Sequence, residues 1–416
     1  MPTPRARHIP QLLDIHAEDL AFLWGQRRAA LDSPEHSLRD IAQLNERIEA
    51  HIQGLLVAPV GVLGPRLEAT IAGGDRDEVF ASAIAALRCD DAAATRLVVT
   101  EFSRAGGPAL LGLRDAMGQA PAKRVADELR NALAHAKPAV AAAAAVALAN
   151  LKLLAPDAAG LGRLLVDEDA TVCAQGWAAA WRADRHAAAA TVAATASSGT
   201  RADRPARPYR EALARPEPSI RHEAWASAAW SGLAQVLTPL RRAVAEGDEV
   251  ALHWLCVLGT PEDTKTLGTA TMALPSAAQR CASLARFGHP AALQTLLRWM
   301  EGDDVVAAHA AGEAFTRITG AEIKGDRRTL PVPGDADEID REMAPLVWMP
   351  AVAKARRLLD EHGARWNAAS RWCAGRRMDI PLSPDEVSTL DLRARWDAAA
   401  RAALAGRPLC APPPIA

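Results

Sequence analysis

The sequence lacks the features that would mark a secreted, zinc-binding or membrane-spanning protein. Its six cysteines lie far apart and form no CxxC pair, so neither a disulfide framework nor a zinc site is indicated. They are Cys89, Cys173, Cys256, Cys281, Cys373 and Cys410. No apolar run approaches the ~18 residues that span a membrane, and the residues after Arg7 are too polar for the core of a signal peptide. We therefore expect a cytoplasmic protein with free thiols and no membrane segment.

Aromatic residues are also scarce, and neither sign of charge is in large excess. Aromatic residues make up only 4% of the 416 residues, with 11 Trp against 5 Phe and 1 Tyr. Alanine is abundant and β-branched runs are few, a balance that favours helices. The formal net charge of -2 and the pI near 6.6 argue against a surface that as a whole attracts nucleic acid or anionic lipid.

The first 60 residues predict a pair of long helices. Apolar residues keep mostly to helical spacing over 12–31, and the polar residues 32–34 then interrupt the pattern. Ser37 can cap a second helix, whose apolar stripe covers 38–55. Two such helices joined by a short polar connector predict an antiparallel pair.

The central part of the chain repeats itself. Residues 164–181 read LLVDEDATVCAQGWAAAW, residues 212–230 read ALARPEPSIRHEAWASAAW, and residues 296–315 read LLRWMEGDDVVAAHAAGEAF. Each copy is an apolar helix end, a turn with acidic or proline residues, and a small-residue helix with an aromatic residue near its end. A period near 30 residues with two helices per unit leaves each unit with a face that only its neighbours can bury. The pattern predicts an α-solenoid.

These repeats carry a family resemblance. The segment EPSIRHEAWASAAW resembles HEAT-like repeats of the bacterial PBS-lyase type, and Arg221 matches the arginine that such repeats carry after the turn. The resemblance covers about residues 75–320. More narrowly, the segments HAEDLAFLWGQRRAAL, IEAHIQGLLVA and AGEAFTRITG are similar to an uncharacterised bacterial HEAT-like family often encoded beside type VI secretion genes. This resemblance implies a cytoplasmic accessory or adaptor protein, with no catalytic residues to carry over.

We expect four parts along the chain. An N-terminal helical pair covers 1–60, a right-handed solenoid of about six to eight helical pairs covers 61–320, and a linker or loop rich in proline and acidic residues covers 321–350. A C-terminal helical segment, which ends in a disordered tail, covers 351–416. The N-terminal pair and the C-terminal segment should act as the two caps of an all-α solenoid. The Gly, Ser, Pro and Arg-rich stretch at 195–208 is expected to be an exposed loop between repeats.

No group of residues has the spacing of a known catalytic, metal or cofactor site. His222-Glu223 is the single His-Glu dipeptide, and a metalloprotease helix would need a second histidine where this sequence has Ala226. We therefore expect no metal, no cofactor and no enzymatic activity. An alternative is an enzyme with a cleft at the repeat turns, which would have to gather His222, Glu223, His309 or Asp304 from separate repeats.

One basic cluster that has an aromatic residue nearby in the sequence is a candidate interaction patch. It comprises Arg201, Arg204, Arg207, Arg210 and Arg221, together with Trp225. HEAT-like DNA glycosylases grip the DNA backbone in a positively charged channel, so nucleic-acid binding is a second alternative. Interspersed Asp and Glu residues dilute the charge, which favours a solvated loop or a docking site for an acidic protein surface. The function that we expect is a scaffold or adaptor for a protein partner, with type VI secretion as the context that the resemblance implies.

Overall fold

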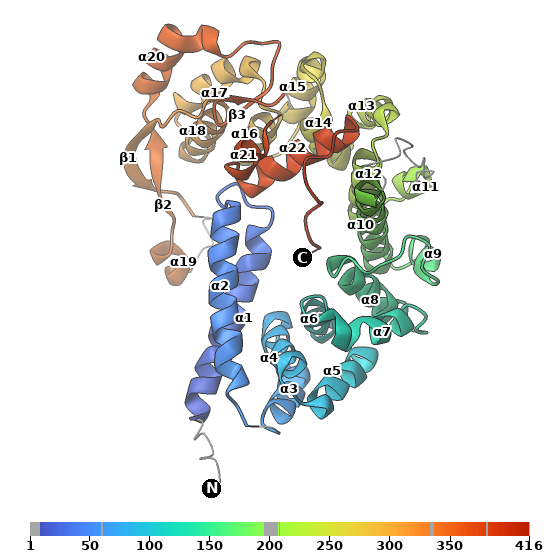
Figure 1. Ribbon diagram of the computed structural model, residues 1–416. Coiled ribbons are helices and arrows are strands. Elements are labelled where there is room, and N and C mark those ends of the chain that lie inside the picture. The colour runs from blue at the N-terminus through green and yellow to red at the C-terminus, as the bar shows by residue number, and fades with distance from the viewer. Residues whose placement is uncertain are drawn as a thin grey trace. The chain divides into compact units, whose positions relative to one another are not determined.

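The computed structural model describes residues 9–59, 61–194, 207, 209–332, 337–379 and 382–415, and it confirms that the regular structure of these residues is mostly helical, with little sheet (Figure 1). The chain forms two compact units. Unit 1 comprises residues 1–233, 388–399 and 408–416, and unit 2 comprises residues 234–387 and 400–407. The boundaries expected at 60, 320 and 350 do not coincide with this division. Two compact units therefore replace four consecutive parts.

Unit 1 contains twelve complete helices in its described residues, together with the first part of α22 (Leu392–Leu404). They are α1 (Pro10–Ala30), α2 (Leu38–Leu56), α3 (Leu63–Gly73), α4 (Arg76–Arg88), α5 (Ala92–Arg104), α6 (Gly107–Met117), α7 (Ala122–Ala132), α8 (Pro138–Asn150), α9 (Leu161–Leu164), α10 (Ala170–Ala194), α11 (Tyr209–Leu213) and α12 (Pro218–Trp230). α4 contacts α6, α6 contacts α8, α8 contacts α10, and α10 contacts α12. We call these five helices the inner row. α3, α5 and α7 make a second line of successive contacts.

Small residues allow the helices of the inner row to approach one another closely. Every residue of α8 from Val140 to Ala149 is buried, including the alanine run at 141–145. A Cβ atom at Gly112 of α6 would lie 2.8 Å from the Cβ of Val79 in α4, so a larger residue does not fit at this crossing. Ridges of small side chains permit helices to pack this closely. The core of unit 1 therefore follows the inner row.

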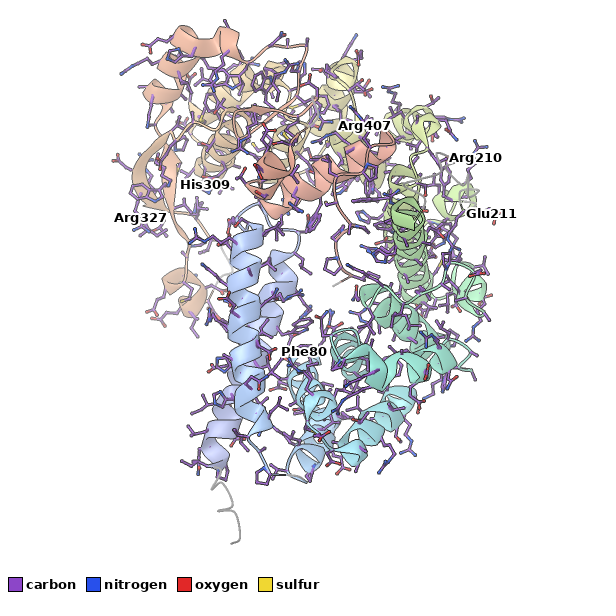
Figure 2. The ribbon with its side chains drawn as sticks, in the orientation of Figure 1. Phe80, Arg210, Glu211, His309, Arg327 and Arg407 are labelled. Carbon is purple, nitrogen blue, oxygen red and sulfur yellow. The ribbon has the colours of Figure 1, made fainter. Side chains whose placement is uncertain are left out.

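The N-terminal pair forms as the sequence predicts. The Ser37 hydroxyl accepts a hydrogen bond from the backbone N–H of Asp40, and the Asp40 carboxylate accepts one from the N–H of Ser37, which completes a capping box at the start of α2. Trp24 of α1 stacks on Phe80 of α4, with ring centroids 3.8 Å apart and planes 9° from parallel; Figure 2 labels Phe80. This contact holds α1 against the first helix of the inner row.

Unit 2 is also helical but carries two small hairpins. Its helices are α13 (Leu237–Ala245), α14 (Glu249–Leu258), α15 (Thr264–Met272), α16 (Ala277–Phe287), α17 (Leu293–Met300), α18 (Val305–Thr319), α19 (Glu338–Glu342), α20 (Val352–His362), α21 (Pro384–Ser388) and the end of α22. Its strands are β1 (Lys324–Thr329), β2 (Leu346–Pro350), β3 (Trp372–Cys373) and β4 (Arg376–Arg377). α14 contacts α16 and α16 contacts α18, so the stacking of successive helices recurs in this unit.

The expectation of a linker or loop at 321–350 needs correction. β1 pairs antiparallel with β2, with Arg327 opposite Trp348, and β2 lies against α18. A Cβ atom at Gly312 would lie 2.7 Å from the Cβ of Pro350, so the glycine makes room for the strand. Pro350 ends β2 and Pro345 precedes it, and prolines are tolerated at strand ends because no ladder N–H is needed there. The prolines that suggested a loop therefore border a hairpin.

The C-terminal segment is not a separate cap. The first part of α22 belongs to unit 1, where Trp396 donates its indole N–H to the carbonyl of Leu31 at 2.7 Å, and the Leu392 N–H donates to the carbonyl of His36, also at 2.7 Å. The segment expected to be a second cap thus contacts the connection between α1 and α2. The tail that was expected to be disordered also makes defined contacts, with α8 and α10. An interaction between residues so far apart in the sequence leaves no local pattern.

Candidate functional site

The predicted basic cluster is described at Arg207, Arg210, Arg221 and Trp225. Arg201 and Arg204 lie outside the described residues. Arg207 forms an ion pair with Asp184, with its Nε 2.6 Å from one carboxylate oxygen and its Nη2 3.0 Å from the other. The same Nη2 donates to the carbonyl of Pro156 at 2.8 Å. Arg207 therefore directs its guanidinium at Asp184 of α10 and at the carbonyl of Pro156 rather than presenting its charge to a ligand.

The remaining members of the cluster take separate roles. Arg221 donates to the carbonyl of Pro216, which secures the turn before α12. Trp225 is 2% exposed and belongs to the core. Arg210 is exposed on α11 beside Glu211 in the sequence (Figure 2). Of the three described arginines in the cluster, Arg210 alone is exposed, and its neighbour in the sequence is acidic.

The histidines and carboxylates considered for catalysis also have local roles. Glu223 accepts the indole N–H of Trp181 at 2.7 Å. Asp304 caps α18 by accepting two backbone N–H groups at 3.0 Å, and the His309 ring, labelled in Figure 2, has its Nδ1 3.3 Å from the carbonyl of Trp348. The described residues contain no group of three or more His, Cys, Asp or Glu side chains that could hold a metal ion.

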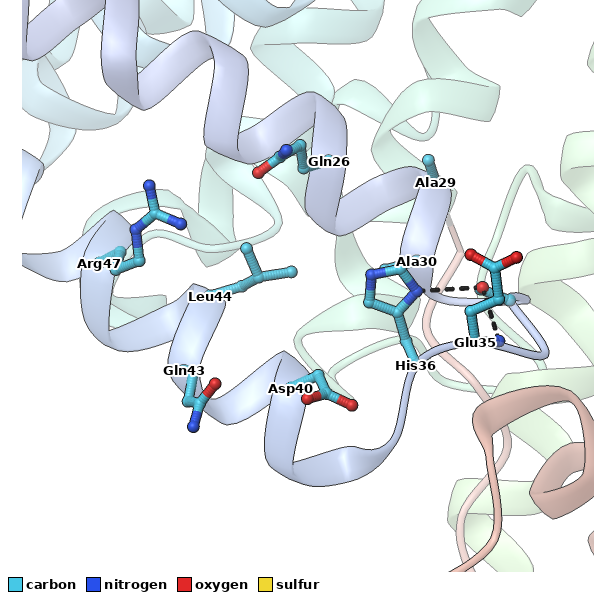
Figure 3. A pocket seen from close by; sticks show the side chains of 10 residues that line it. Gln26, Ala29, Ala30, Glu35, His36, Asp40, Gln43, Leu44 and Arg47 are labelled. Carbon is cyan, nitrogen blue, oxygen red and sulfur yellow. Dashed lines mark hydrogen bonds between the residues drawn. The ribbon is translucent and has the colours of Figure 1, made fainter. Parts of the chain in front are cut away.

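A pocket of about 540 Å³ lies between the end of α1 and the start of α2 (Figure 3). Its lining includes Gln26, Ser33, His36, Asp40, Gln43 and Arg47. The Ser33 hydroxyl lies 3.0 Å from Nδ1 of His36 and accepts the Glu35 N–H at 3.0 Å. Hydrogen bonds from Ser37 lower the pKa of Asp40, which is the capping carboxylate of α2. Several polar groups of the pocket therefore hold the turn between the helices.

The arrangement with the most specific geometry lies at the end of α8. The Ile415 N–H donates to Oδ1 of Asn150 at 2.9 Å, and Nδ2 of Asn150 donates back to the Ile415 carbonyl at 3.0 Å. One side-chain amide thus satisfies both main-chain polar groups of a single residue. This pairing places the tail against unit 1 without using any polar side chain of the tail.

Arg182 of α10 makes the second contact with the tail. Its Nε donates to the carbonyl of Pro413 at 2.9 Å, and its Nη1 donates to the carbonyl of Ala178 at 2.9 Å. Burial lowers the pKa of Arg182, and the Glu223 carboxylate, 3.6 Å away, partly offsets that effect. The guanidinium also lies over the ring of Trp181, 4.1 Å from its centroid. A buried, fixed donor therefore faces the main chain of the tail.

Comparisons with protein-family models, curated proteins and solved structures find no match for this chain. Within the described residues, none of the helices combines the length and the apolar character needed to cross a bilayer. The candidate site must therefore be judged from its own geometry.

The tail site consists of Asn150, Arg182 and the segment at 411–415, and sequence reasoning missed it. In Figure 1 the end of the chain lies beside α8 and α10, the two helices that carry these side chains. The signal in the sequence was the run of three prolines followed by an apolar residue, which is typical of an extended segment suited to binding. The arrangement can hold an extended chain by its backbone, which is a binding function rather than a catalytic one.

Proposed function

We propose that this protein is a non-enzymatic scaffold of the α-solenoid type that binds another protein along unit 1. The observation that supports the proposal is the inner row, in which each of five successive helices packs on the next. Stacked helical repeats of this kind create extended surfaces, and proteins built from them commonly bind partners along those surfaces. The period near 30 residues in the sequence agrees with a two-helix unit.

The resemblance to HEAT-like repeats supports a narrower form of the proposal. Because residues 16–31, 48–58 and 311–320 are similar to a bacterial family often encoded beside type VI secretion genes, we propose a cytoplasmic adaptor whose partner belongs to that apparatus. The nucleic-acid alternative gains little from the described arginines, since Arg207 and Arg221 donate to groups of unit 1 itself.

The proposal is tested by affinity purification of the tagged full chain from bacterial cells at low and high salt, followed by mass spectrometry and a nucleic-acid assay. Apolar and shape-based protein contacts tolerate salt, whereas phosphate contacts weaken steeply as salt rises. We expect a protein partner that persists at high salt. Nucleic acid as the sole ligand, lost at high salt, would reject the scaffold.

Lysine-reactive crosslinking then locates the partner on the chain. In unit 1, Lys123 of α7 is exposed, as are Lys137 and Lys152, which lie just before and after α8. Lys265 and Lys324 are exposed in unit 2 and serve as a matched reference. We expect the partner to crosslink to the three lysines of unit 1. Crosslinks confined to unit 2 would show that the inner row is not the binding surface.

A further inference from the structure

We propose that the face of α8 and α10 that carries Asn150 and Arg182 is a binding site for an extended, proline-rich segment of a protein partner, and that residues 411–415 occupy this site as an intramolecular competitor. The inference rests on the proposed function, because it assigns one part of the scaffold surface to one class of ligand. It adds the chemistry of the ligand and the way in which the chain itself limits access.

Recognition at this site is directed at the main chain. Asn150 pairs with both the N–H and the carbonyl of Ile415, and Arg182 donates to the carbonyl of Pro413. These three hydrogen bonds use no polar side chain of the tail. A segment from another protein with an extended backbone can therefore offer the same groups at the same places.

Arg182 needs a carbonyl from outside its own helix. The residue is 8% exposed, and its Nε is directed at the carbonyl of Pro413. Its Nη1 is already bonded to Ala178, and the Glu223 carboxylate at 3.6 Å lies beyond normal hydrogen-bond distance. Because an unsatisfied buried donor is costly, the face is complete only when an extended chain supplies the acceptor.

The three consecutive prolines explain why the ligand should be rich in proline. Pro412, Pro413 and Pro414 have no N–H to satisfy, so the segment presents carbonyls to the donors of Arg182 and Asn150. Their fixed φ angles also keep the free segment extended, which reduces the conformational entropy lost on binding. The Ile415 side chain packs against the apolar cluster of unit 1.

The tail is held loosely enough to exchange. Ala411 is exposed, and residues 412–415 are half-buried rather than enclosed. Release of the tail therefore returns only a limited apolar area to water. A tethered segment competes at an effective concentration on the order of millimolar, so it lowers the apparent affinity for a partner without excluding a strong one.

The test uses the full chain and the synthetic peptide PLSAPPPI, in which serine replaces the tail cysteine. Burial raises the pKa of the Cys410 thiol in the docked tail, so its alkylation is slow. As the peptide approaches about millimolar concentration and displaces the tail, we expect the alkylation rate of Cys410 to rise severalfold. Cys89, which is half-buried at the end of α4, serves as an internal reference and should keep its rate.

Two pairs of variants test the same site by direct binding of a fluorescent form of the peptide. Ile415→Asp places a charge against the apolar cluster and should release the tail, so the apparent Kd for the peptide should fall about tenfold. Leu409→Asp adds the same charge at a position that is 36% exposed and should behave as the wild type. Adding Asn150→Ala to Ile415→Asp should remove the gain, whereas adding Asn131→Ala, an exposed change in α7, should not.

The inference is wrong if about 10 mM peptide leaves the alkylation rate of Cys410 unchanged. This test uses the wild-type chain, so it does not depend on whether a variant folds. It is also wrong if Ile415→Asp binds the peptide no more tightly than the wild type, or if Asn150→Ala has no effect on that binding. A partner that is captured equally by the wild type and by Asn150→Ala would keep the scaffold proposal and reject this site. Peptide binding without capture of any partner would keep this site and reject the scaffold proposal.

Discussion

Replacement of Arg371 by methionine should destabilise unit 2 more than most substitutions can. Arg371 is 3% exposed and precedes β3. Its guanidinium donates to the carbonyls of Phe287 at 2.6 Å, Val257 at 2.9 Å and Gly259 at 2.6 Å. These carbonyls lie at the ends of α14 and α16, where a helix has acceptors without partners and a partial negative charge. The arginine therefore joins two helix ends to the β3–β4 hairpin.

The magnitude is a lower bound taken from these three contacts, since Arg371 also donates to the carbonyls of Cys256 and Arg286. A hydrogen bond that involves a charged group contributes about 1.5–3 kcal/mol to stability. Taking the lower value for each of the three bonds gives a loss of about 4–5 kcal/mol for Arg371→Met. Arg371→Lys keeps the charge but replaces the planar fork of five N–H donors by a point charge with three donors. It should recover about half of that loss, because an ammonium group cannot reach both helix ends with the same geometry.

The assay combines urea unfolding with hydrogen exchange resolved along the sequence, because a chain with two compact units need not unfold in one step. Faster exchange should appear in α14 and α16 of the methionine variant, while the inner row of unit 1 keeps its protection. Arg298→Met, an exposed change on α17, is the matched control and should cost less than about 0.5 kcal/mol. A loss below about 1 kcal/mol in Arg371→Met, with unchanged exchange in α14 and α16, would refute the reasoning.

Three further perturbations test other contacts. Gly288→Ala should cost at least about 2 kcal/mol in urea unfolding, because φ is +69° at Gly288 and a Cβ atom would collide with the carbonyl of Trp372; a near-neutral result would contradict this geometry. Burial lowers the pKa of His289, whose neutral ring donates a hydrogen bond to the Ala368 carbonyl at 2.7 Å. The contribution of His289 to the free energy of unfolding is therefore complete above about pH 6.5 and is lost as the pH falls. The free energy of unfolding of His289→Gln, measured in urea, should therefore change less between about pH 7 and pH 5 than that of the wild type. Asp115 is 4% exposed and accepts hydrogen bonds from side chains of α1, α4 and α6, so Asp115→Ala should cost about 3–5 kcal/mol, and a cost under about 1 kcal/mol would contradict a structural role.

The helical part of the fold follows closely from local patterns. The stripe over 38–55 predicts α2, and Ser37 caps it as its position suggests. The alanine run at 141–145 predicts a helix packed closely by its neighbours, and all of these residues are buried. Such predictions succeed because the period of apolar residues and the chemistry of a cap act over a few residues.

The hairpins and the tail could not be predicted in the same way. β1 and β2 are separated by sixteen positions that include prolines and acidic residues, and each strand is too short to show a clear alternation. The pairing of Asn150 with Ile415 joins positions 265 apart in the sequence, and neither residue has a pattern that points to the other. Contacts of this kind depend on the packing of the whole unit, which a local sequence pattern cannot predict.

Arginine chemistry connects these non-local contacts. Only six of the 48 basic residues are lysine, and the sequence suggested that arginines gather into a patch for a ligand. The structure instead uses Arg182 and Arg371 as internal donors to carbonyls that lie 231 and up to 115 residues away. A guanidinium suits this role because its planar fork can satisfy several carbonyls at once while its charge faces the negative ends of helices. The difference between the two residues lies in what supplies the carbonyls. Arg371 faces helix ends that cannot leave, whereas Arg182 faces a half-buried segment that can, which is why the second arginine marks a binding site and the first does not.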